Sequence, residues 1–209
     1  MTEFNACFIS YRHPNDDSAK RFVQTFVDEL SAQLQMNLPN ARIFFDRDGI
    51  KVGDLFNEEL ALQLCRSACL VICYGPRHFD LTHRYCTLEY LGMRQLEERR
   101  RRDLNNYLDR NGLIFPVVFR GFASLPVEIT NTRQCIQFDD VVEPADFRRR
   151  RRREKIRQLA QEIYDRWDQL ERGGIFANHD CSGFRFPASE VDLWLSQNAN
   201  PTRTPMPGR

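Results

Sequence analysis

The sequence lacks several features that would assign it to a compartment or class. None of its apolar runs approaches the roughly 20 residues that a membrane-spanning helix requires. Its first residues do not have the basic flank and apolar core of a secretory signal peptide. It has no CxxC pair, and its 7 cysteines lie mostly in apolar segments. We therefore expect a cytoplasmic protein with reduced, packed thiols, and neither a disulfide framework nor a zinc site.

The sequence also contains no G-x-G-x-x-G motif, so we do not expect a dinucleotide held as in a Rossmann dehydrogenase. The net charge of +1 conceals two arginine blocks, at residues 99–102 and 148–153. Aromatic residues are not interleaved with these blocks, which argues against a surface that stacks nucleic-acid bases. We interpret the blocks as solvated faces, with a site for a polyanion or an acidic partner as the alternative.

The composition is that of an ordinary globular protein. Hydrophobic residues make up 42% of the chain and charged residues 28%, and 209 residues suffice for one compact domain with an appendage. We predict a main domain over residues 1–172 and a C-terminal extension packed on it over residues 173–197. Residues 198–209 are rich in Pro, Asn and Thr and are expected to form a flexible tail.

Five short apolar runs predict β-strands, because they are too short for helices and end at turn signals. They lie at residues 4–11, 41–45, 69–74, 113–119 and 135–138. Pro116 in the fourth run predicts a strand near an edge or a local irregularity, since proline cannot donate to a sheet ladder.

Apolar residues at helical spacing follow the first three runs and return after residue 148, ending at Gly173 and Gly174. Strands that alternate with helices favour right-handed βαβ units. The expected fold class is therefore α/β, a flavodoxin-like, doubly wound parallel sheet of five strands with helices on both faces.

Polar segments follow the first three predicted strands. Ser10, Tyr11 and Arg12 end the first, residues 46–53 follow the second, and residues 75–89 follow the third. Ligands of open parallel sheets bind outside the carboxyl ends of the strands, where the strand order reverses. We therefore expect these three segments to converge on one site.

Three motifs in these segments resemble those of the TIR domain family. Residues 8–11 (FISY) resemble its first box, and residues 44–53 (FFDRDGIKVG) resemble its BB loop. Residues 85–89 (YCTLE) resemble its W-C-x-x-E motif, with tyrosine in place of tryptophan. The resemblance covers about residues 3–170 and implies the TIR fold.

Within that family, the chain resembles prokaryotic stand-alone, NAD-consuming proteins of Thoeris-like antiphage defence. The resemblance implies an NAD+ nucleosidase or cyclase that cleaves the nicotinamide-ribose bond. Its products would be nicotinamide and either ADP-ribose or a cyclic ADP-ribose-type messenger, read by a separate nucleotide-sensing effector. NAD+ would then be a substrate, and we expect no cofactor and no metal.

Glu89 matches the glutamate of the W-C-x-x-E motif, which in the enzymatic members lies against the nicotinamide ribose. A carboxylate suits this chemistry, because departure of neutral nicotinamide leaves an oxocarbenium-like ribose that a negative charge stabilises. The alternative is that Glu89 is only a first-turn acid that compensates the helix macrodipole.

Substrate-binding residues are expected in the same segments: Ser10, Tyr11, Arg12, Phe45, Arg47, Phe79 and Cys86. Phe45 or Phe79 would offer an aromatic surface to a ring, and Arg47 would face a phosphate. Tyr11 and Phe45 could equally close the core at their strand ends.

Other groups near this site are interpreted as structural. We expect Cys86 to be a packed thiol and not a nucleophile, since no basic partner is fixed beside it by the sequence. His78 and His83 are interpreted as surface histidines, because acidic ligands with metal-site spacing are missing.

A non-catalytic function remains the alternative. The loop that begins with Asp46 and ends with Gly53 could serve TIR-TIR self-assembly, and Arg47 would then contact a neighbouring domain. Such a protein would be an interaction scaffold or a mimic of host TIR domains.

Overall fold

The protein is built on one parallel β-sheet. The computed structural model describes residues 4–12, 17–45, 56–80, 84–104, 112–178 and 180–198. The sheet order is β2-β1-β3-β4-β5, and every strand pair is parallel. This is the flavodoxin-like, doubly wound arrangement, so the predicted fold class is confirmed. The strands are β1 (Asn5–Tyr11), β2 (Ile43–Phe44), β3 (Ser67–Tyr74), β4 (Ile114–Val118) and β5 (Ile136–Gln137).

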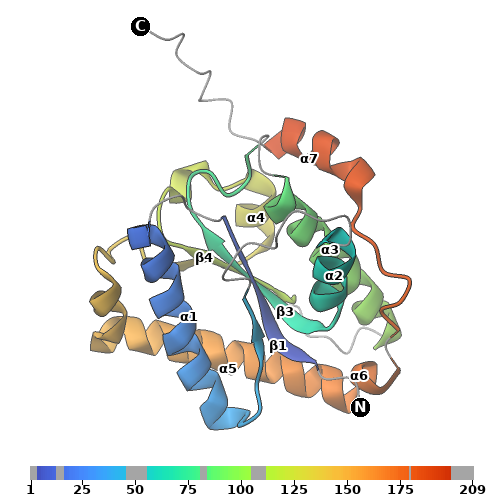
Figure 1. Cartoon of the computed structure of the whole chain (residues 1–209), viewed down its shortest axis with the longest axis horizontal. Coiled ribbons are helices and arrows are strands. Elements are labelled where there is room, and N and C mark those ends of the chain that lie inside the picture. Colours follow the sequence, from blue (N-terminus) through green and yellow to red (C-terminus); the bar gives the residue numbers. More distant parts are fainter. Residues whose placement is uncertain are drawn as a thin grey trace, which may run out of the picture.

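Helices cover both faces of the sheet. α1 and α5 pack together on one face, and α2 and α3 pack on the other (Figure 1). Their bounds are α1 (Asp17–Asn37), α2 (Phe56–Cys65), α3 (Tyr85–Asp103), α4 (Val127–Thr132), α5 (Arg150–Arg172), α6 (Ile175–Asn178) and α7 (Val191–Asn198). Short 3-10 turns are η1 (Phe122–Ser124), η2 (Pro144–Arg148) and η3 (Ala188–Glu190). We did not predict α4 or α7 from the sequence. No helix among the described residues is long and apolar enough to span a bilayer.

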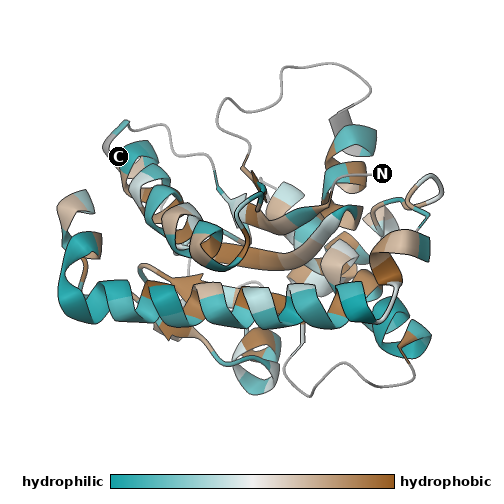
Figure 2. Ribbon diagram, turned by 90° about the horizontal axis from the view of Figure 1, so that it is seen from below, coloured by the Kyte–Doolittle hydropathy of each residue, from teal (hydrophilic) through white to brown (hydrophobic). Residues whose placement is uncertain are grey.

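The core lies between the sheet and its helices. In α1, Phe26, Leu30 and Leu34 recur every fourth residue and are fully buried, so this face of the helix packs inward. The strands are brown in Figure 2, while much of the outer surface of the helices is teal. Burial of both faces of the sheet explains why β1 and β3 are continuous apolar runs without alternation.

Pro116 lies in β4, one strand in from the edge of the sheet. The Leu113 carbonyl accepts from the Leu70 amide on the β3 side, and the Val118 carbonyl accepts from the Phe138 amide on the β5 side. The backbone groups of successive residues in a strand point alternately toward its two neighbouring strands. The nitrogen of Pro116 therefore faces the β5 side. Pairing with β5 begins only at Val117, so the missing donor leaves the paired part of the ladder intact.

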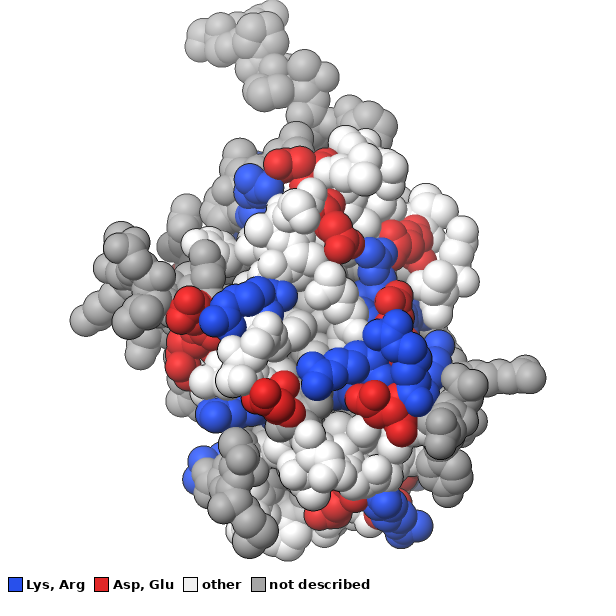
Figure 3. Space-filling view, turned by 90° about the vertical axis from the view of Figure 1, so that its right-hand side faces the viewer, with Lys and Arg blue, Asp and Glu red and all other residues white. Residues whose placement is uncertain are grey.

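The C-terminal extension begins with α6 packed on α5, and its later part, including α7, packs on the α3 side of the sheet. Glu128 of α4 joins the elements there, accepting from the Tyr90 hydroxyl at 2.8 Å and from the Trp194 indole at 2.6 Å. Arg94 binds the same carboxylate at 3.0 Å. Asn198, expected to begin the tail, is the last residue of α7, and residues 199–209 lie outside the described residues. Basic and acidic side chains are interleaved on this side of the molecule (Figure 3).

The expectation that all cysteines are reduced was wrong. Cys65 at the end of α2 and Cys181 in the extension form a disulfide across 116 residues of sequence. The pairing depends on the extension folding back onto α2, which neither cysteine spacing nor an odd count reveals. Disulfides are uncommon in reducing compartments such as the cytoplasm. This bond therefore does not favour the cytoplasmic location, which stays a prediction. The other cysteines are free: Cys7, Cys69, Cys73, Cys86 and Cys135.

The interpretation of residues 99–102 as a solvated face was wrong for one arginine. Arg100 is 0% exposed and donates to the carbonyls of Cys65, Ser67 and Ala68 at 2.7–3.1 Å. These carbonyls lie where α2 ends and β3 begins, so the guanidinium satisfies acceptors that neither element satisfies itself. Burial lowers the pKa of Arg100 to about 10, which keeps it protonated near neutral pH.

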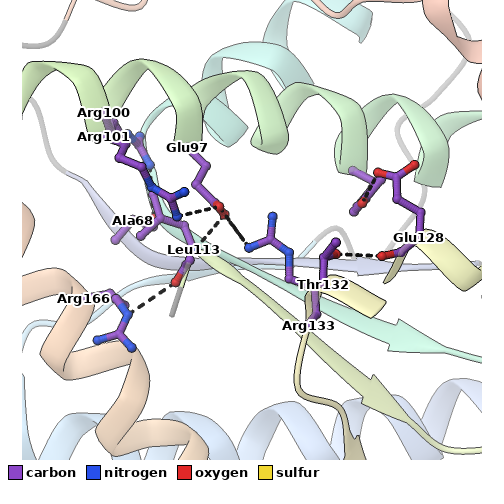
Figure 4. Close-up of polar contacts among 11 residues, drawn as sticks. Ala68, Glu97, Arg100, Arg101, Leu113, Glu128, Thr132, Arg133 and Arg166 are labelled. Carbon is purple, nitrogen blue, oxygen red and sulfur yellow. Dashed lines mark hydrogen bonds and ion pairs between the residues drawn. The ribbon is translucent and has the colours of Figure 1, made fainter. Parts of the chain in front are cut away.

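A second buried charge lies one turn earlier on α3. Glu97 accepts from Arg133 at 2.8 Å and from the Leu113 amide at 2.8 Å, with Arg101 at 3.3 Å (Figure 4). Both Glu97 and Arg100 therefore lie near the amino ends of β3 and β4, opposite the edge where the functional site was predicted. This network joins α3 to the sheet.

Candidate functional site

The candidate site lies at the carboxyl edge of the sheet, where β1 and β3 end side by side. Ser10 pairs in register with Ile72, and Tyr11 with Cys73. β1 and β3 are the central strands from which the chain winds in opposite directions, since β2 lies beyond β1 and β4 lies beyond β3. This is the topological switch point at which ligands bind in folds of this type.

His78 lies in this site and is not on the surface, so its interpretation as a surface histidine was wrong. It follows β3 in a turn closed by its own amide bonding to the Gly75 carbonyl at 2.9 Å. Its imidazole is 1% exposed, and Nε2 lies 3.3 Å from the Ser10 hydroxyl. The position of His78 in residues 75–89, the segment that follows the third predicted strand, was the sequence signal that could have placed it here. His83 lies outside the described residues.

The environment of His78 keeps its ring neutral. Its pKa is lowered to about 3, mainly by burial and to a smaller extent by the positive charge of Arg12, while a hydrogen bond with the Cys73 backbone partly offsets these effects. A base with so low a pKa accepts a proton weakly near neutral pH. The Ser10-His78 pair is therefore poorly suited to serine nucleophilic catalysis, and it serves better to orient the Ser10 hydroxyl.

We predict that His78 makes the folded protein sensitive to acid. Its pKa is about 3 when folded and about 6.5 in an unfolded chain, so the unfolded chain binds one more proton between these values. The associated stability is fully present above pH ~6.5 and is lost as the pH falls. Between pH ~5.5 and ~4.5, His78→Gln should reduce the fall in unfolding free energy by about 1.4 kcal/mol, measured by urea denaturation. If the unfolding free energy fell equally with pH in both proteins, the result would contradict a buried, neutral His78.

Cys86 and Glu89 come to the same site from α3. They are three residues apart and therefore share one face of the helix. Cys86 is buried, and burial raises its pKa well above the ordinary value. The charge of Glu89 raises it further, while a hydrogen bond with Ser10 and the charge of Arg12 act in the opposite direction. The thiol is thus protonated near neutral pH, which supports a packed group and not a nucleophile.

Glu89 does not fit the alternative of a helix-start acid. α3 begins at Tyr85, its first turn contains no acidic residue, and Glu89 is the fifth residue. Its exposure is only 7%, whereas macrodipole compensation is ordinarily the work of exposed first-turn acids. Burial of a carboxylate costs free energy. The presence of the buried Glu89 at the edge of the sheet where ligands bind in such folds therefore favours a functional role for it.

Arg12 closes the site on the side of the β3-α3 connection. Its guanidinium donates to the Arg77 carbonyl at 2.9 Å and to the Asp80 carboxylate at 3.1 Å. Both charged side chains are partly exposed, at 21% and 29%. An arginine fixed in this way at the rim can contact an anionic ligand while it stays bonded to the protein.

The structure separates the predicted aromatic residues into two groups. Tyr11 and Phe45 pack on each other, with ring centroids 4.8 Å apart, at the ends of β1 and β2. Phe79 packs against His78 at 4.7 Å and against Trp194 at 5.1 Å, so its ring supports the back of the site. Arg47 and the remainder of residues 46–53 lie outside the described residues.

Comparison with known proteins does not place the chain in a family: no family model matches it, and no curated protein matches it.

Proposed function

We propose that this protein is a TIR-type NAD+ nucleosidase or cyclase, in which Glu89 acts on the nicotinamide-ribose bond. The observation that carries the proposal is a buried carboxylate, Glu89, held on α3 behind the ends of β1 and β3. Ser10, Arg12 and Glu89 all act on the thiol of Cys86, so one hydroxyl and one cation lie in the same neighbourhood as the carboxylate. The proposal includes a role in antiphage defence, in which the protein produces ADP-ribose or a cyclic messenger.

We assign a different role to each of these side chains. As nicotinamide leaves, positive charge develops on the ribose, and the carboxylate of Glu89 stabilises it. The burial of Glu89 strengthens this interaction, because electrostatic effects grow where water is excluded. Arg12, which is partly exposed at the rim, is suited to bind a phosphate oxygen, whereas Ser10 is fully buried and, with His78, supports the site from behind.

Incubation of the purified protein with NAD+ tests the proposal. Chromatography should resolve nicotinamide together with ADP-ribose or a cyclic product, and Glu89→Gln should lower the rate of nicotinamide release by about a hundredfold. The matched control is Glu98→Gln, which removes an exposed carboxylate from the same helix and should leave the rate unchanged. Circular dichroism should show equal helix content in all three proteins.

Two outcomes would overturn the proposal. Nicotinamide release that survives Glu89→Gln would remove this carboxylate from the mechanism. No release over a wide range of protein concentrations, including those at which the protein self-associates, would favour the non-catalytic interaction module.

A further inference from the structure

A basic groove runs between the beginning of α5 and the end of α1, on the face of the sheet opposite α3. Its volume is about 420 Å³, and it is lined by Gln33, Met36, Arg148, Arg150, Arg153, Glu154 and Arg157. Arg150, Arg153 and Arg157 are three and four residues apart, so they project from one side of α5. None of these residues belongs to the candidate active site.

Two of the groove arginines form no ion pair with the residues that the structure describes. Arg148 pairs with Glu29 at 2.9 Å, and Arg157 pairs with Glu154 at 2.6 Å. Among the residues that the structure describes, Arg150 and Arg153 have no carboxylate within ion-pair distance. Both side chains are exposed.

These cations are also placed at the unfavourable end of their helix. The first turn of α5 contains no acidic residue, and its N-cap, Arg149, makes no side-chain capping bond. A helix amino terminus carries partial positive charge, so arginines there destabilise the free protein. Binding of a group with several negative charges would relieve this repulsion.

Met36 indicates what kind of anion the groove fits. It is 76% exposed and lies on the α1 side of the groove, one turn after Gln33. A flexible, exposed methionine beside arginines suits a partner that presents an apolar side chain between carboxylates. Nucleic acid would gain little here, because the lining contains no aromatic ring for base stacking.

We propose that this groove docks an acidic, amphipathic segment of a partner protein. Carboxylates of the segment bind Arg150 and Arg153, and an apolar side chain packs on Met36. The site is independent of Glu89 and of the proposed NAD+ chemistry.

Fluorescence anisotropy with two probes tests this proposal. One probe is a labelled amphipathic helix of Glu and Leu, and the other is a labelled single-stranded DNA of equal net charge. The peptide should bind more tightly. Arg150→Gln/Arg153→Gln should weaken peptide binding by about tenfold or more, and Met36→Gln should weaken it by about tenfold without changing DNA binding.

The matched control is Arg151→Gln/Arg172→Gln, which removes two exposed charges from the same helix outside the groove. It should leave peptide affinity within about twofold, because neither side chain lines the groove. Equal loss in the control and the groove variant would show nonspecific attraction and overturn the proposal. Absence of peptide binding would also overturn it, as would tighter binding of DNA that is indifferent to Met36→Gln.

Discussion

Replacing Arg100 with methionine is expected to lower the free energy of unfolding by about 3–4 kcal/mol. Methionine fills much of the same space, so the loss reports mainly on hydrogen bonding. Without the guanidinium, the carbonyls of Cys65, Ser67 and Ala68 lose a buried donor, and each such loss costs about 1 kcal/mol or more. The energy gained by no longer burying a charge offsets part of this cost. Urea denaturation followed by circular dichroism provides the measurement.

The arginine block supplies its own control. Arg102 is exposed and lies only two residues further along α3, so Arg102→Met should change the unfolding free energy by no more than about 0.5 kcal/mol. An equal effect of the two substitutions would mean that the buried hydrogen bonds of Arg100 contribute nothing specific. A loss below about 1 kcal/mol for Arg100→Met would mean that water or local rearrangement satisfies the three carbonyls.

Breaking the Cys65-Cys181 bond is expected to lower the free energy of unfolding by about 4 kcal/mol. The bond closes a loop of 116 residues, and a cross-link across so long a loop strongly restricts the unfolded chain. The test is Cys181→Ser, because Cys181 is half-buried and its replacement introduces little strain, whereas Cys65 is fully buried. Denaturation with and without a dithiol reductant should give equal stabilities for the variant and different ones for the wild type.

Cys135→Ser is the matched control for this substitution. Cys135 is also half-buried but carries a free thiol, so the variant should retain the full response to reductant. If the wild type and Cys181→Ser lost equal stability on reduction, the effect would not come from this bond. A wild type that did not respond to reductant would show that the two thiols are not joined in solution.

The sequence was sufficient to predict the strands, because a sheet covered on both faces requires apolar runs whatever the surrounding detail. It was insufficient for α4, where Ile129 is the only buried residue of a six-residue helix and gives no periodic signal. It was also insufficient for Arg100, which lies within four consecutive arginines of identical local character. Which of them turns inward depends on the distant carbonyls that α2 and β3 leave without partners.

For the candidate site, too, some features could be predicted from the sequence and others could not. Ser10, Arg12, Cys86 and Glu89 could be placed together from the sequence, because the carboxyl ends of neighbouring parallel strands meet at one edge. The burial of His78 could not be predicted from the sequence, since it depends on how the turn after β3 folds back over β1. Charge and composition indicated a basic segment at residues 148–153, but its opposition to Met36 exists only once α1 and α5 are packed together.

The packing of α7 gives the protein an optical reporter of its own. The chain has 2 tryptophans, and Trp194 is the one buried on α7, with its indole bonded to Glu128 and its ring 5.2 Å from that of Tyr90. Trp167 lies instead on α5, against Phe176. With Trp167 replaced by phenylalanine, intrinsic fluorescence would therefore follow the attachment of the C-terminal extension to α3 without any added dye.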